Sequence, residues 1–105
     1  MSAKLKLNLD ERLPDFDLPV KFQLPNGNEM KINFIVRHLS GEEIQDLYKN
    51  SKEDKDFIMA LATGWDVVQE FNESNAARLI NLYPAAAIAL SGTYMQALAG
   101  YRVKN

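Results

Sequence analysis

The sequence predicts an α+β fold, in which an N-terminal β-hairpin precedes a cluster of about four short helices. Residues 20–24 and 30–36 alternate apolar and polar side chains with the two-residue period of a strand. From residue 40 onward, apolar residues recur at the three- and four-residue spacings of a helix. The 105 residues fit one domain, which we divide into an arm (1–17), a hairpin (18–38) and a helical region (40–101).

The arm contains a short alternating segment, residues 4–9. This pattern predicts either an extra edge strand or a frayed terminus, and the residues themselves do not decide between the two. Pro14 and Pro19 follow, and because proline has no N–H, we expect both to limit a hydrogen-bonded ladder.

The hairpin is predicted from its turn as well as from its strands. Asn26-Gly27 lies between the alternating stretches, and this dipeptide readily adopts the positive φ angles of a tight hairpin turn. Ile35 interrupts the alternation of the second strand. We therefore expect part of that strand to be covered on both faces.

The helices are predicted from start and stop signals in addition to their apolar spacing. The first signal is a capping box, in which a serine hydroxyl and a glutamate satisfy free backbone amides at the helix start. The signals are the Ser40/Glu43 capping box, Gly64 as the C-cap of the second helix, Asn72 as the N-cap of the third, and Pro84 in the first turn of a fourth helix that spans Ala85 to Ala99.

Composition argues against several classes of site. The chain has no cysteine, which excludes disulfides, cysteine-based zinc sites and iron–sulfur clusters. Its net charge of −2 and lack of a basic patch argue against nucleic-acid binding. The acidic residues lack the spacing of a calcium loop. The sequence therefore predicts no metal, no cofactor and no catalytic residue.

Two side chains could suggest a site, and for both we favour a structural role. His38 is the only histidine and lies where the second strand meets the first helix, without a partner for acid–base chemistry nearby in the sequence. Trp65 follows the second helix beside apolar residues. We expect it to pack on the core, with its indole N–H donating to a carbonyl.

Charge is distributed unevenly along the chain. Residues 1–56 carry 20 of the 26 charged side chains, and the run from Leu79 to Tyr101 carries none. The run is long enough to span a bilayer, but its polar residues and alanines argue against a membrane helix. A buried core helix remains an alternative. We favour a helix with one face on the core and another for a partner, because so small a domain seldom surrounds a helix completely.

The candidate partner-binding residues form two stripes on this last helix. The first stripe is Ile88, Gly92, Met95 and Ala99, and the second includes Leu90 and Tyr94.

The order of the motifs resembles that of a known family. The quoted segments are Pro25-Asn26-Gly27, Phe34-Ile35-Val36-Arg37-His38, Ser40-Gly41-Glu42-Glu43, Gly64-Trp65-Asp66, Phe71-Asn72, Leu79-Ile80, Tyr83-Pro84, Ala87-Ile88, Tyr94, Ala97-Leu98, Gly100 and Lys104-Asn105. In this order and spacing the chain resembles the tail assembly chaperones of long-tailed bacteriophages.

The resemblance implies a non-enzymatic assembly factor of the host cell cytoplasm that is absent from the mature virion. Such a factor binds the tape measure protein and promotes assembly of the tail tube, whose subunit is a second candidate partner. The alternative is a structural virion component, such as a tail completion or connector protein. Self-association as a homo-oligomer stays open, because a hairpin edge and an apolar helix both favour it.

Overall fold

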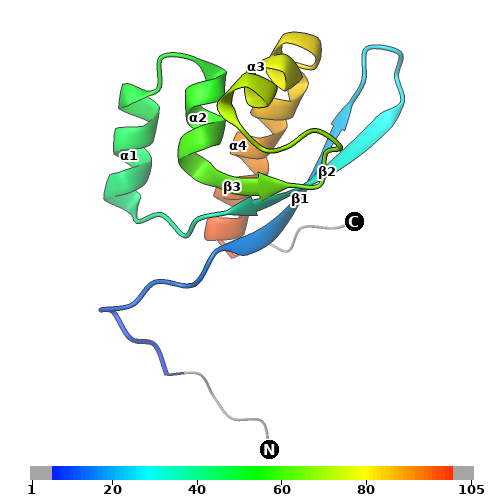
Figure 1. Cartoon of the computed structure of the whole chain (residues 1–105). Helices are drawn as coiled ribbons and strands as arrows, with labels where there is room; N and C mark the ends of the chain where they lie inside the picture. Colours follow the sequence, from blue (N-terminus) through cyan, green and yellow to red (C-terminus); the bar gives the residue numbers. More distant parts are fainter. Residues whose placement is uncertain (1–5, 101–105) are drawn as a thin grey trace, which may run out of the picture.

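The computed structural model describes residues 6–100. Within them, β1 (Phe16–Gln23), β2 (Glu29–Val36) and β3 (Ala62–Trp65) form an antiparallel sheet in the order β1-β2-β3 (Figure 1). One face of the sheet is buried against the helices and the other is largely open to solvent. The predicted α+β class with an N-terminal hairpin is confirmed.

The hairpin buries alternate residues of both strands, as its pattern predicts. Its inward side chains are Leu18, Val20, Phe22, Ile32, Phe34 and Val36. The Leu24 N–H donates to the Asn28 carbonyl at 2.7 Å, which leaves residues 25–27 as a three-residue loop. Only Gly27 of this loop has a positive φ, +89°, so the loop places a single left-handed residue at its end.

Pro19 lies inside β1, which begins at Phe16, two residues before the predicted boundary. Successive antiparallel pairs alternate between hydrogen-bonded and non-bonded pairs. Asn33 lies opposite Pro19 but forms its backbone hydrogen bonds with Asp66. The Asn33 N–H donates to Asp66 Oδ1 at 2.9 Å, and the Asn33 carbonyl accepts from the Asp66 N–H at 3.2 Å. The missing N–H of Pro19 therefore faces the outer edge of the sheet. The expectation that Pro19 limits the ladder is wrong for this reason.

Over residues 6–15 the arm makes no strand, and its last two residues, Phe16 and Asp17, belong to β1. Residues 6–15 have no strand pairing and are exposed to solvent, and in Figure 1 they extend away from the sheet and helices. An edge strand is therefore absent over this part, while Lys4 and Leu5 of the predicted segment lie outside the described residues. The third strand of the sheet comes from the helical region.

The first helix begins as its capping box predicts. In α1 (Gly41–Asn50), the Glu43 N–H donates to Ser40 Oγ at 3.1 Å and the Ser40 N–H donates to Glu43 Oε1 at 2.8 Å. These two bonds satisfy backbone donors that the start of the helix leaves free.

The second helix does not end at Gly64. In α2 (Asp54–Leu61), the C-cap residue Ala62 is already extended, and the chain continues directly into β3. Gly64 instead pairs with Ile35, and a Cβ on this glycine would lie 3.3 Å from Ile35 Cδ1. Gly64 thus allows a close approach of β3 to β2. Ile35 itself is 38% exposed on the outer face, so the expected coverage on both faces is wrong.

The last two helices follow their predicted signals. At the start of α3 (Glu73–Leu82), the Asn75 N–H donates to Asn72 Oδ1 at 2.8 Å. Pro84 is the N-cap of α4 (Ala85–Leu98), and Gly100, with φ of +88°, follows the helix end. In the assembled fold α4 packs along β1, while α2 packs against α3 (Figure 1).

Candidate protein-contact surface

The structure separates the two stripes that the sequence places on α4. Leu90 and Tyr94 are buried in the core, with 0% and 2% of their surface exposed. Ile88 is 74% exposed and Met95 is 43% exposed. Gly92 and Ala99 are exposed as well. The stripe of Ile88, Gly92, Met95 and Ala99, which we call the α4 stripe, is therefore open to solvent, while the other faces inward.

Tyr94 is buried because its hydroxyl is satisfied inside the protein. It donates to the Arg37 carbonyl at 2.7 Å and accepts from the Leu39 N–H at 3.0 Å, and its ring stacks on Phe16. Burial raises the pKa of Tyr94, and the hydrogen bond from the Leu39 backbone opposes that rise. Its contacts give Tyr94 a role in joining elements of the fold.

A groove runs beside the α4 stripe, between α4 and the corner where α1 meets α2. It has a volume of about 340 Å³, and Ile88 and Ser91 line it opposite Tyr48 and Phe57. The hydroxyls of Tyr48 and Ser91 hydrogen bond across it. The charged side chains of the groove, Lys52, Glu53 and Asp54, come from the α1–α2 connection and the start of α2. The groove thus has an uncharged wall on α4 and a charged rim on the other side.

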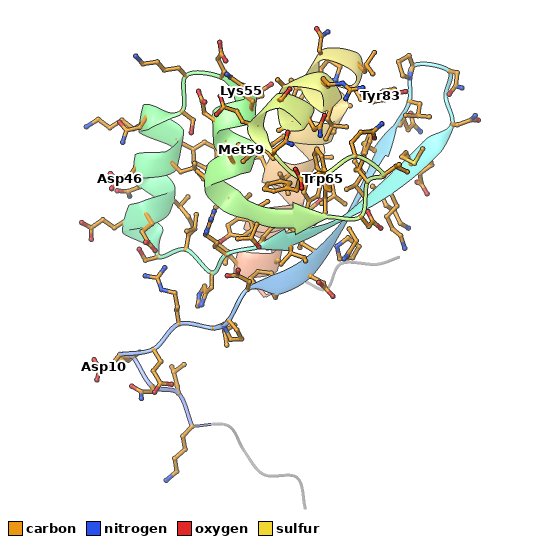
Figure 2. The ribbon with its side chains drawn as sticks, viewed as in Figure 1. Asp10, Asp46, Lys55, Met59, Trp65 and Tyr83 are labelled. Carbon is orange, nitrogen blue, oxygen red and sulfur yellow. The ribbon has the colours of Figure 1, made fainter. Side chains whose placement is uncertain are left out.

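A second apolar surface, which sequence reasoning missed, lies between the hairpin and α3. Two adjoining hollows of about 300 and 140 Å³ share Val67, Leu79 and Tyr83. Figure 2 shows Tyr83 between α3 and the hairpin, where its ring lies 6.4 Å from that of Phe22. Exposed apolar residues beside the hollows are Met30, Val68 and Leu82. We call this the hairpin–α3 surface. Its one signal in the sequence is a connector, residues 65–71, that is unusually apolar for a loop.

Trp65 packs on the core as predicted. Its indole N–H donates to the Gln69 carbonyl at 2.8 Å, and its ring lies edge-on to Phe71 and Phe34 with centroids 5.2 and 6.3 Å away. This arrangement turns the 65–71 connector back over β3. Trp65 also forms one end of the smaller hollow of the hairpin–α3 surface.

His38 contacts the arm. Its Nδ1 accepts a hydrogen bond from the Leu13 N–H at 2.8 Å. Between residues 6 and 100, no group of three or more histidines and carboxylates lies close enough to hold a metal ion. No helix within the same range is both long and apolar enough to cross a membrane.

Exposed apolar surfaces such as the α4 stripe and the hairpin–α3 surface are typical of proteins that contact other proteins. A family model described as phage tail assembly chaperone matches residues 1–105, the whole chain. The chain therefore belongs to the phage tail assembly chaperone family. No curated protein and no solved structure matches the chain. Membership of this family implies protein partners in tail assembly.

Proposed function

We propose that this protein binds the tape measure protein through the α4 stripe, keeps it soluble in the host cytoplasm and promotes assembly of the tail tube around it. Two observations support the proposal. The chain belongs to a family of tail assembly chaperones. Its longest helix, with 14 residues, carries no charge and exposes an apolar stripe that nothing within the described chain covers. The stripe is the observation that carries the proposed site.

The shape of the stripe suits a helical partner. Ile88, Gly92, Met95 and Ala99 follow helical spacing, so they lie along one side of α4. A Cβ on Gly92 would meet nothing within 4 Å, which leaves a dip between Ile88 and Met95. Ridges of side chains on one helix pack into such depressions on another, and helix-in-groove binding is a common mode of recognition. The absence of charge on α4 means that docking there desolvates no ion on this helix.

Co-expression with the tape measure protein tests the proposal. We expect the wild-type chain to raise the soluble fraction of that partner and to co-purify with it. The double variant Ile88→Asp/Met95→Asp should lose most of this effect, because it places two charges in the apolar contact. A loss of one to two large apolar contacts weakens binding by about 2 to 4 kcal/mol, or roughly 30- to 1,000-fold.

The matched control is Val68→Asp on the hairpin–α3 surface, since Val68 is 98% exposed. It introduces one negative charge, where the double variant introduces two, on a surface residue outside the α4 stripe. If Val68→Asp abolishes the effect while the double variant keeps it, the contact lies on the hairpin–α3 surface and the proposed site is wrong. If the partner is equally insoluble with and without the wild-type chain, the proposed function itself is wrong.

We also propose that the protein is absent from the mature virion, and the composition of purified particles tests this. A chaperone that leaves after assembly should be absent from purified virions, whereas a tail completion or connector protein should be present in fixed stoichiometry. Quantitative mass spectrometry of purified particles distinguishes the two. A stoichiometric amount of this chain would support the structural role instead.

A further inference from the structure

The N-terminal arm is fixed to the body of the protein at its base. Arg12 Nη1 donates to the His38 carbonyl at 3.1 Å and to Glu43 Oε1 at 2.8 Å. The Leu13 N–H donates to His38 Nδ1 at 2.8 Å. All three bonds end at the junction between β2 and α1. We propose that His38 is an acid-released latch that holds the arm against this junction.

The chemistry of the latch follows from which imidazole nitrogen accepts. Nδ1 can accept the Leu13 N–H only as the unprotonated nitrogen of a neutral imidazole, whose proton is then on Nε2. When the imidazole gains a second proton, Nδ1 carries its own N–H, which faces the N–H of Leu13. A hydrogen bond is lost and two donors are brought together. Acid therefore breaks this contact and leaves the His38 carbonyl as an acceptor for Arg12.

The charged groups around His38 come from several elements. Asp10, Glu11 and Arg12 of the arm line a shallow hollow together with His38 and Ser40. Glu43 reaches the same point from α1. On the sheet side, the Arg37 guanidinium donates to the carbonyls of residues 59, 60 and 62, and the Tyr94 hydroxyl from α4 donates to the Arg37 carbonyl.

Glu43 makes the release a two-step process. The hydrogen bond from the Ser40 backbone, followed by that from Arg12, lowers the pKa of Glu43 below its ordinary value of 4.5. A free imidazole binds its second proton at a higher pH than a free carboxyl does, so Glu43 is still ionised when the latch opens. The contribution of a carboxylate with a lowered pKa is present above its ordinary value and is lost as the pH falls through the lowered one. The Arg12–Glu43 pair therefore outlasts the Leu13–His38 bond.

The latch fixes the direction in which the arm presents its apolar side chains. Leu7 and Leu9 are 89% and 90% exposed, and they lie beyond the latched residues. Figure 2 shows Asp10 of the arm well away from the helices, so the described arm meets the body mainly at its base. With the latch closed, these leucines extend from a fixed point beside α1. With it open, their position relative to α1 is no longer fixed by His38.

Amide hydrogen exchange by NMR tests the latch. The chain has one histidine, so no other imidazole titrates between pH 7.5 and 5.5. We expect the protection factor of the Leu13 amide, relative to that of the core amide of Phe34, to fall about three- to tenfold over this range. This is the loss expected for one hydrogen bond of about 0.5 to 1.5 kcal/mol. The protection factor of Phe34, inspected by itself, shows whether global stability also changes over this range.

Two variants separate the latch from other effects of acid. His38→Asn places an amide oxygen near the position of Nδ1, and this oxygen accepts at every pH in the range, so the ratio should stay high and flat. His38→Ala should give a low ratio at both pH values. The proposal is overturned by a wild-type ratio that does not change with pH, by an Asn variant that falls as the wild type does, or by an Ala variant as protected as the wild type at pH 7.5.

Discussion

At the scale of single residues, Tyr94 joins three parts of the fold through its hydroxyl and its ring. Its bonds to the Arg37 carbonyl and the Leu39 N–H tie α4 to the segment that connects β2 with α1, and its ring stacks on Phe16 of β1. The helical spacing of Tyr94 predicts a stripe on α4 but does not tell which way that stripe faces. The two backbone partners are 55 and 57 residues away in the chain, so only the folded structure places them beside the hydroxyl.

Removing this hydroxyl should destabilise the protein measurably. Tyr94→Phe leaves the Leu39 N–H and the Arg37 carbonyl without this partner, and we expect the free energy of unfolding to fall by about 1 to 3 kcal/mol. Urea denaturation followed by circular dichroism measures the change. The matched control is Tyr48→Phe, whose hydroxyl bonds Ser91 on a half-exposed side chain and should cost under about 1 kcal/mol. Equal costs for the two variants would contradict the structural role of Tyr94.

At the scale of elements, local signals determine where most helices and turns begin. The Ser40/Glu43 capping box, the Asn72 cap and the Pro84 start all act within one turn of helix, so the sequence contains the whole interaction. The short strand β3 is different. Its four residues are held by pairing with β2, nearly 30 residues earlier, and four residues are too few to show a period. For this reason the sequence predicts a helix cap at Gly64, whereas the structure pairs Gly64 with Ile35 in a strand.

Replacing Gly27 or Gly92 by alanine should change the free energy of unfolding in opposite directions. Gly27 has φ of +89° in the hairpin loop, so Gly27→Ala should lower the free energy of unfolding by about 1 to 2 kcal/mol. Gly92 lies within α4, and a Cβ added there would meet nothing within 4 Å. Gly92→Ala should therefore raise the free energy of unfolding by about 0.5 to 1 kcal/mol, because alanine has the higher helix propensity.

Thermal and urea unfolding of the two variants measure these changes in the free energy of unfolding. Since both substitutions add the same methyl group, a change of the same sign in both would contradict the assigned backbone conformations. Gly92→Ala also fills the dip of the α4 stripe, so weaker co-purification of the tape measure protein despite higher stability would agree with the proposed site.

At the scale of the whole molecule, one charge-free helix supplies both core and surface. The sheet covers only one side of α4, and Leu90 is fully buried there while Ile88 stays 74% exposed. A chain of 105 residues has too little remaining structure to cover the second side. The hairpin–α3 surface arises in the same way, since the 65–71 connector leaves Val68 exposed above the hollows it helps to form.

Substitutions on the buried side of α4 should reduce stability, whereas substitutions on its exposed side should reduce partner binding. Leu90→Ala should cost about 2 to 5 kcal/mol of folding free energy, because it removes buried contacts and leaves a cavity. Ile88→Ala should change stability by less than about 0.5 kcal/mol and instead reduce recovery of the tape measure protein. Urea denaturation and co-purification of each variant check this. An Ile88→Ala variant that unfolds as readily as Leu90→Ala would show that the α4 stripe belongs to the core.

The sequence by itself determined the α+β class, the hairpin, the helix starts and the family resemblance. Each rests on residues close together in the chain or on their order along it, such as the Gly27 turn and the Ser40/Glu43 box. Tertiary structure alone decided which stripe of α4 is exposed, that β3 completes the sheet, and that His38 meets Leu13 of the arm. These features depend on which segments distant in sequence pack together, and periodicity within one segment carries no information about its neighbours.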